Sequence, residues 1–318
     1  MIRTAALVAL VLAAAACTSS GGGSDDEGGA AGDAEAPPAE ADAPPYEVAM
    51  EVETFVDPSR PTAAEGGNPG APDRTLETHL YFPADAEGPF PLIAFAHGLD
   101  GHPRKFSELF EAWAAAGYVV ASPAFPLTND EIAGDVFVGD FTNQPADLSF
   151  VVDEVLALSG DTDGPLAGLV DEDRIGAGGL SLGSSTAYAV SYHSCCRDDR
   201  IRATVIMSTL FAPFDGTYDV SGTPLLILHS EGDPALAHEA SAEVFALAAP
   251  PKFFVTLLSD AHAAPFEDAP DPTSEAVRDI TTTFWDTYLA GDGDPEAVDG
   301  LVGVAVVEGL TTLDAEHP

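Results

Sequence analysis

The chain has 318 residues, with 53 acidic against 11 basic side chains and a formal net charge of −42 at pH 7. This balance excludes nucleic-acid binding, because so many carboxylates repel phosphates. The acids are spread along the whole sequence. Such a distribution is typical of adaptation to high salt, or of a composition biased toward alanine, glycine and aspartate.

The first 17 residues have the pattern of an export signal. Arg3 precedes an apolar run from Ala5 to Ala16, which is too short to span a membrane and suits the core of a signal peptide. The run ends in small residues followed by Cys17, which resembles the lipobox of bacterial lipoproteins, where the cysteine is lipidated. We expect an extracytoplasmic protein of the bacterial cell envelope, anchored to the membrane through Cys17. Ordinary secretion with cleavage near Ala16 is the alternative.

Residues 18–45 are dominated by glycine, serine, alanine, proline and acids, and none of them is aromatic. Such a segment buries too little apolar surface to offset the entropy lost on ordering. We therefore expect a flexible acidic tether over 18–46. One folded domain is expected over 47–318, where apolar segments recur.

Strand-like and helix-like segments alternate along this domain. In chain order, the patterns predict strands at 75–82 and 91–97, a helix at 103–117, a strand at 118–125, a helix at 145–159, a strand at 174–181, a helix at 186–194, strands at 203–208 and 224–230, a helix at 238–249, a strand at 252–259 and a closing helix at 275–291. Continuous apolar strands between amphipathic helices predict an α/β fold with a mostly parallel sheet and helices on both faces. Ligands bind such sheets at the carboxyl ends of the strands.

The segment between Phe125 and the helix near Pro145 is too short for a large cap domain. It is either a short flap, with Phe137 and Phe141 lining the mouth of a site, or a plain surface loop.

The sequence GGLSLG at 178–183 places Ser181 between a predicted strand and a predicted helix. G-x-S-x-G is a weak signal in a chain with 30 glycines, so its context decides. After a strand and before a helix, the motif marks a strained turn that exposes the hydroxyl at the top of the sheet. Gly179 and Gly183 leave room for the close approach of strand and helix. Ser181 is therefore the candidate nucleophile.

A serine nucleophile needs a general base and an acid that orients the base, in the chain order serine, acid, histidine. Three of the eight histidines lie late enough in the chain. His238 begins a predicted helix, and His317 is the penultimate residue, which we expect to be frayed. His262 follows a buried strand directly and is the candidate base.

The candidate acid is Asp233, in the turn after the strand at 224–230. Asp215 lies seven residues beyond the strand at 203–208, so it is expected to have left the top of the sheet. Asp260 lies two residues from His262 and is expected to bind its own loop backbone.

An oxyanion formed at Ser181 needs two backbone N–H donors. Leu182, directly after the nucleophile, is expected to supply one, and Leu99 the other. Gly98 lets the loop turn sharply, and His97 is expected to support this loop rather than to act as a second base.

Taken together, the segments PLIAFAHGLDG, GLSLG, SEGDPA and DAHAAPF resemble the α/β-hydrolase superfamily over about residues 50–290. Within it, FVDPSRPT, RTLETHLYFPA and FAHGLDG look like the branch of dienelactone-hydrolase-like proteins and platelet-activating-factor acetylhydrolases, and EGDPA and DAHAAPF look more like cutinases and polyester hydrolases. Dienelactone hydrolases use a cysteine where this chain has Ser181. Polyester hydrolases usually have an aromatic residue in the oxyanion loop, where this chain has Leu99.

The resemblance and the residues together imply a serine hydrolase that cleaves carboxylic esters, small or lipid-like, through Ser181, His262 and Asp233. This chemistry needs no metal or cofactor. The alternatives are a non-catalytic binding lipoprotein on a hydrolase fold, or a peptidase of the same fold.

Two of the three cysteines, Cys195 and Cys196, are adjacent. They either form a vicinal disulfide or remain as buried thiols. His193 alone offers too few further ligands for us to expect a metal there.

Overall fold

The computed structural model describes residues 46–84 and 86–317. The predicted signal peptide, the lipidation site at Cys17 and the tether up to residue 45 lie outside the described residues. None of the helices that are described is long and apolar enough to cross a bilayer.

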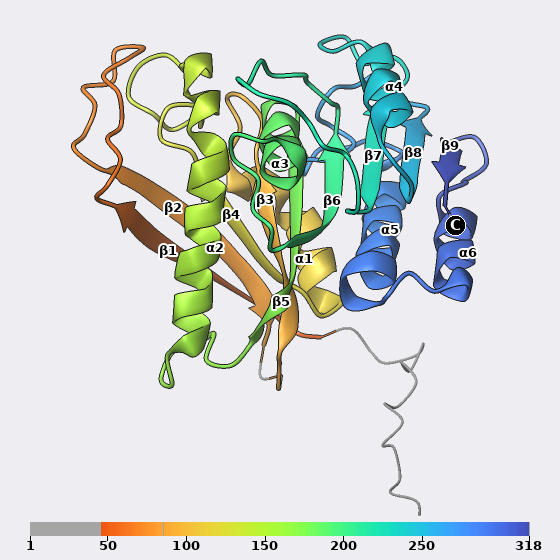
Figure 1. Cartoon of the computed structure of the whole chain (residues 1–318), viewed down its shortest axis with the longest axis horizontal. Coiled ribbons are helices and arrows are strands. Elements are labelled where there is room, and N and C mark those ends of the chain that lie inside the picture. Colours follow the sequence, from red (N-terminus) through yellow and green to blue (C-terminus); the bar gives the residue numbers. More distant parts are fainter. Residues whose placement is uncertain (1–45, 85, 318) are drawn as a thin grey trace, which may run out of the picture. The chain divides into compact units, whose positions relative to one another are not determined.

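The described residues form a mixed α/β fold around one nine-stranded sheet (Figure 1). The strands lie side by side in the order β1-β2-β4-β3-β5-β6-β7-β8-β9. Among the six central strands β4, β3, β5, β6, β7 and β8, neighbours pair in parallel. The pairs β1–β2, β2–β4 and β8–β9 are antiparallel. The strands are β1 Val48–Asp57, β2 Arg74–Pro83, β3 Phe90–Ala96, β4 Val119–Ala124, β5 Val170–Leu180, β6 Ile201–Met207, β7 Leu225–Ser230, β8 Lys252–Leu257 and β9 Thr311–Glu316.

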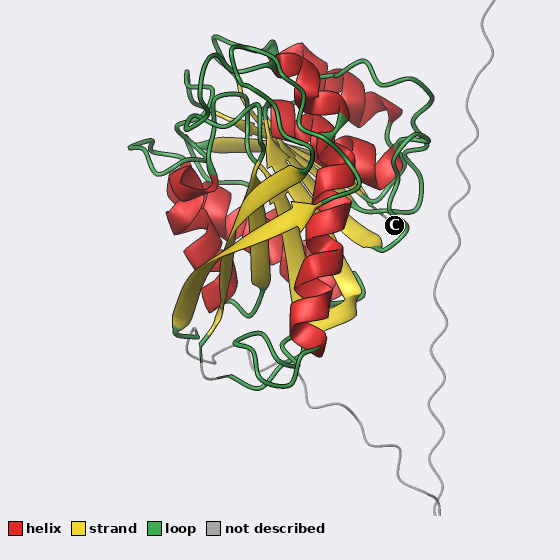
Figure 2. Ribbon diagram, turned by 90° about the vertical axis from the view of Figure 1, so that its left-hand side faces the viewer, coloured by secondary structure: helices red, strands yellow, loops and turns green. Residues whose placement is uncertain are grey.

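Helices cover both faces of the sheet (Figure 2). One face packs against α2 Gln144–Gly160, α3 Leu182–Tyr192 and α4 His238–Leu247. The other packs against α1 Ser107–Ala115, α5 Ser274–Trp285 and α6 Pro295–Val304. Three short elements complete the described helices: the 3₁₀ turns η1 Pro103–Phe106 and η2 Val138–Thr142, and the π-helical η3 Asp286–Ala290.

The central strands are continuously apolar because both of their faces are covered. In β3, Leu92 and Ala94 belong to the core beneath α2 and α3, while Ile93 and Phe95 belong to the core beneath α1 and α5. Alternate side chains of a strand point to opposite faces, so one short apolar run supplies both cores. The predicted mostly parallel sheet with helices on both faces is confirmed.

The sequence prediction missed elements at both edges of the sheet. The strand β1 was not predicted, and the helix at 275–291 is not the last element, because α6 and β9 follow it. The expectation that His317 is frayed is also wrong. The strand β9 pairs with β8, and the ring of His317 stacks on Phe253 with the ring centroids 5.9 Å apart.

The segment 126–143 is held to its surroundings at several points. The backbone N–H of Asp135 donates to the carbonyl of Gly66 at 2.7 Å. The ring of Phe141 packs edge-on against Phe214 at 5.1 Å. Buried Arg74 of β2 forms an ion pair with Asp140 of η2 at 2.9 Å. These contacts fix the segment 126–143 to the rest of the domain.

Candidate active site

Three of the predicted site residues follow the carboxyl ends of parallel strands. Ser181 comes directly after β5, Asp233 follows β7 and His262 follows β8. Parallel strands end at the same edge of a sheet, and this is the edge at which ligands bind in open α/β sheets.

Ser181 lies in a strained turn between β5 and α3. Its backbone has φ 55° and ψ −116°, a conformation that non-glycine residues rarely adopt and that costs free energy. The turn is held in place because the Ser181 N–H donates to Met207 O at 2.9 Å, and the Ser184 N–H donates to Ser181 O at 2.9 Å. The half-buried serine is therefore fixed by its neighbours in β6 and α3.

The glycines on either side of Ser181 have no room for a side chain. A Cβ atom on Gly179 would lie 2.1 Å from Gly183 O, and one on Gly183 would lie 2.0 Å from Ala96 O. Gly98, in the loop after β3, lies beside the serine, since a Cβ there would be 3.3 Å from the Ser181 Cβ. The role that the sequence predicted for Gly179 and Gly183 is thus confirmed.

His262 and Asp233 are hydrogen-bonded to each other. His262 Nδ1 lies 2.6 Å from Asp233 Oδ2, and the Asp233 side chain is fully buried. A carboxylate can only accept, so Nδ1 carries a proton, and in the neutral ring the lone pair is on Nε2. The backbone of this loop is held as well, because Ser208 Oγ donates to His262 O at 3.2 Å. The ring and the backbone of His262 are thereby held in one orientation.

The surroundings of Asp233 favour its ionised form. The backbone N–H groups of Ala235 and Leu236 donate to Oδ1 at 2.8 and 2.9 Å. Burial raises the pKa of the Asp233 carboxyl, but the hydrogen bonds from His262, Leu236 and Ala235 outweigh burial and bring the pKa below its ordinary value. The carboxylate therefore stays charged beside His262.

A second histidine, His229 of β7, contacts the same carboxylate and was not predicted. Its Nε2 lies 3.1 Å from Asp233 Oδ2, and its Nδ1 lies 2.7 Å from Ser241 Oγ in α4. Burial lowers the pKa of His229 more than Asp233 raises it, so the ring is neutral. A neutral ring that donates from Nε2 must accept from Ser241, and it then fixes the rotation of the carboxylate.

The other two aspartates considered do not occupy this position. Both Asp215 and Asp260 are exposed, and the Asp260 carboxylate lies against the backbone of Gly232, where an added Cβ would be 2.1 Å from Oδ1. Of the three, Asp233 is the one bonded to His262.

The loop after β3 is organised by buried His97. Its Nδ1 lies 2.7 Å from Gly98 O, and its Nε2 accepts from the N–H of Phe125 at 3.1 Å. Burial lowers the pKa of His97 to about 4, so the ring is neutral at pH 7. The ring thus joins the loop after β3 to the segment after β4, which agrees with the expected supporting role.

Two further contacts hold the turn of this loop. The Asp100 N–H donates to Thr128 O at 2.8 Å, and Lys105 Nζ donates to Asp100 O at 2.8 Å. Leu99 lies between Gly98 and Asp100 and is exposed, while Leu182 is buried as the first residue of α3. The two expected oxyanion donors thus belong to the two segments that flank Ser181.

Ser181 and His262 are not hydrogen-bonded to each other among the residues that the structure describes. They are linked through the end of β6 instead. The Ser181 N–H donates a hydrogen bond to Met207 O, and the hydroxyl of the next residue, Ser208, donates one to His262 O. Bonds between a nucleophile and its base are often long in the absence of substrate.

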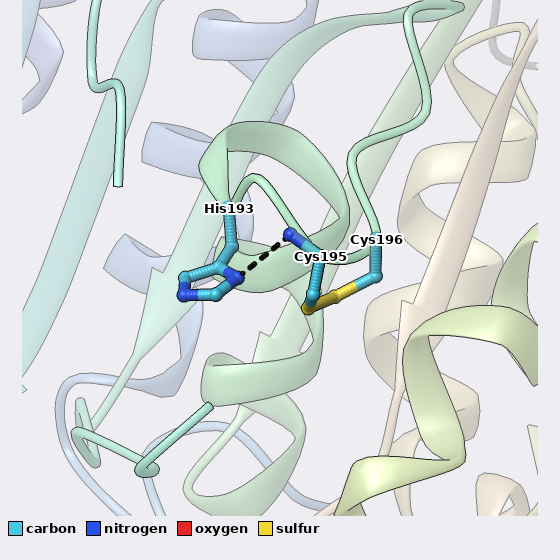
Figure 3. A group of neighbouring side chains, drawn as sticks. All are labelled: His193, Cys195 and Cys196. Atoms are coloured by element: carbon cyan, nitrogen blue, oxygen red, sulfur yellow. Dashed lines mark hydrogen bonds between the residues drawn. A yellow bond between two sulfur atoms is a disulfide. The ribbon is translucent and has the colours of Figure 1, made fainter. Parts of the chain in front are cut away.

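Cys195 and Cys196 form a disulfide just beyond the end of α3 (Figure 3). The Cys195 N–H donates to His193 Nδ1 at 3.1 Å. Of the two states that the sequence left open, the structure shows the vicinal disulfide. Because the sulfurs bond each other, they are not available as thiolate ligands.

Comparison with known proteins does not assign the chain to a family. No protein-family model matches the chain, and no curated protein matches it significantly.

Proposed function

We propose that this chain is a serine hydrolase of the α/β-hydrolase superfamily that cleaves carboxylic esters. The observation that carries the proposal is the 2.6 Å hydrogen bond between His262 Nδ1 and buried Asp233, at the same sheet edge as the strained Ser181 turn. The order serine, acid, histidine along a mostly parallel sheet supports the superfamily. The runner-up, a non-catalytic binding lipoprotein, gives no reason for such an arrangement.

In the proposed reaction, Ser181 Oγ attacks the acyl carbon of the ester while His262 Nε2 takes the hydroxyl proton. The negative charge that develops on the carbonyl oxygen is stabilised by the N–H groups of Leu99 and Leu182. The C–O bond to the alcohol then breaks, and the alcohol leaves with the proton held by His262. An acyl group remains on Ser181.

Water then hydrolyses the acyl-enzyme, with His262 again transferring the proton. His262 Nε2 takes a proton from water as its oxygen attacks the acyl carbon. The bond to Ser181 breaks, the serine recovers the proton, and the carboxylic acid is released. Asp233 stays ionised throughout and stabilises the imidazolium that forms in each half-reaction.

The proposed substrates are esters met outside the cytoplasm, small or lipid-like. This part of the proposal rests on the sequence of residues 1–17, where Cys17 would carry a membrane anchor.

A fluorophosphonate probe tests the proposal because it labels an activated serine hydroxyl. We expect labelling of the full chain, loss of labelling in Ser181→Ala, and retained labelling in Ser221→Ala, which changes an exposed serine. Hydrolysis of aryl esters of increasing chain length should disappear with the label. A folded protein that is unlabelled and hydrolyses no ester would favour the binding lipoprotein, whereas preferential cleavage of amides would favour a peptidase.

A further inference from the structure

A cluster of ionisable side chains lies between β2 and the loop that follows β3, apart from the residues proposed to react. It consists of Glu77, His79, His102 and Glu131, and we call it the histidine–glutamate cluster. Glu77 and His79 are two residues apart in β2, so their side chains leave the same face of the strand. His102 comes from the loop, and its ring meets that of His79 edge-on with centroids 5.3 Å apart.

The donor atoms of the cluster converge without bonding one another. Glu77 Oε1 lies 3.6 Å from His79 Nε2 and 4.0 Å from His102 Nε2, and Glu131 Oε2 lies 3.8 Å from His102 Nε2. These separations exceed hydrogen-bond distances. Four donors around a tetrahedral Zn²⁺ at bond lengths near 2.1 Å lie about 3.4 Å apart. Glu77, His79 and His102 each offer one ligand atom, and these three atoms all lie within 4.8 Å of one another. A contraction of about an ångström or less brings these three to the spacing of a metal site.

His79 lacks the partners that a buried imidazole needs. The residue is 7% exposed, and its Nδ1 is buried with no hydrogen-bond partner within residues 46–84 and 86–317. Its Nε2 faces the Glu77 oxygen at 3.6 Å. A cation at Nε2 would give that nitrogen a full partner. The ring proton would then lie on Nδ1, which has no acceptor in the described part of the chain, and this cost opposes binding.

The neighbouring Arg104 neutralises part of the negative charge near the cluster but does not pair with Glu77. Its guanidinium pairs with Glu131 Oε1 at 2.9 Å and with Asp130 at 2.7 Å. The ion pairs that Glu77 makes are with the two histidines. The carboxylate between the imidazoles is thus the one that arginine does not neutralise.

One contact opposes metal binding at His102. Its Nδ1 accepts a hydrogen bond from the Arg104 N–H at 3.3 Å, which is long for such a bond. An ion at Nε2 would move the ring proton to Nδ1, and this weak bond would be given up.

We propose that the histidine–glutamate cluster binds one divalent transition-metal ion of the Zn²⁺ class. The ligands are Nε2 of His79, Nε2 of His102 and the Glu77 carboxylate, and water would complete the coordination. Imidazole and carboxylate ligands without thiolate suit Zn²⁺ and Co²⁺ better than soft Cu⁺. The ion would join β2 to the loop that carries Gly98 and Leu99, and so hold that loop beside Ser181.

Titration with Co²⁺ alone tests the site, because the visible absorption of bound Co²⁺ reports its coordination. With the full chain free of metal and reductant, we expect one equivalent to bind with a low-coordination spectrum. Glu77→Gln should weaken binding by about tenfold to a hundredfold. Because Glu77 is half exposed, this change should leave the fold intact. His79→Ala and His102→Ala should abolish the spectrum, with folding checked by circular dichroism.

Two controls separate the site from other ligands. Glu111→Gln removes an exposed carboxylate of α1 and should leave the titration unchanged. The double variant Cys195→Ser and Cys196→Ser removes the sulfurs beside His193 and should also leave it unchanged. Wild type that binds no Co²⁺, or a Glu77→Gln variant that binds it as tightly as wild type, would overturn the proposal. Ester hydrolysis is not the readout, so failure here leaves the proposed reaction untouched.

Discussion

Asp233 accepts hydrogen bonds from two histidines, and only one of them, His262, is proposed to react. If Asp233 fixes the proton of His262 on Nδ1, Asp233→Asn should lower turnover by about 10⁴ while the protein still folds, as for the equivalent change in a serine protease. Steady-state hydrolysis of an aryl ester measures this. The matched variants Asp215→Asn and Asp260→Asn should lose far less. A crippled Asp215→Asn beside a mild Asp233→Asn would show that the acid is assigned wrongly.

His97 gives stability a specific pH dependence. Its pKa is about 4 in the folded chain and near 6.5 when unfolded, so between these values only the unfolded chain takes up a proton there. Stability should therefore fall as the pH is lowered from about 6.5 to about 4, by roughly 3 kcal/mol from this residue. Denaturant unfolding across this range measures the slope, and His97→Gln should be less steep. Equal slopes in both proteins would refute the assignment.

The contrast between His262 and His229 shows how far single residues can be predicted from the sequence. His262 was found because it lies in a loop after a buried strand, and the carboxyl ends of parallel strands meet at one edge. His229 lies inside the apolar run LLILHS, which gives no local sign of a polar partner. Its contacts with Asp233 and Ser241 arise only when α4 packs against β7.

At the scale of elements, the turn between β5 and α3 depends on the absence of side chains. Gly183→Ala would place a Cβ 2.0 Å from the Ala96 carbonyl oxygen, so β3 and α3 must separate. We expect a loss of more than about 4 kcal/mol in the free energy of unfolding, or no folded protein. Chemical denaturation followed by circular dichroism provides the measurement.

Gly160 provides a control for this substitution. A Cβ at Gly160, the last residue of α2, would meet no atom within 4 Å. Gly160→Ala should leave stability unchanged or raise it by up to about 1 kcal/mol. A Gly183→Ala variant as stable as Gly160→Ala would mean that the turn is looser than the structure indicates.

Central and edge elements differ in how well the sequence predicts them. A strand covered on both faces is a continuous apolar run, so β3, β6 and β7 were predicted from their composition alone. The edge strand β9 reads TTLDAE, in which Thr312, Asp314 and Glu316 are exposed and only one face meets the core. Its strand conformation comes from pairing with β8, a long-range contact that no local pattern records.

At the scale of the whole molecule, the net charge of −42 should make stability depend on salt. The dispersed carboxylates repel one another, and salt screens repulsion beyond about 10 Å at 0.1 M. We expect the thermal midpoint to rise between low and molar NaCl. Sucrose at matched water activity serves as an uncharged control and should raise it less. A flat or falling midpoint in NaCl would count against adaptation to high salt.

The pairing of β9 with β8 also prevents one copy of the chain from pairing with another through β8. Without β9, the free edge of β8, with the apolar residues Phe253, Phe254 and Val255, would offer unpaired N–H and C=O groups to the same strand of another copy. The exposed Asp314 and Glu316 make β9 a poor partner for such pairing, because like charges would meet. A few acidic residues at the rim of the sheet thus keep one of its most apolar strands from starting aggregation.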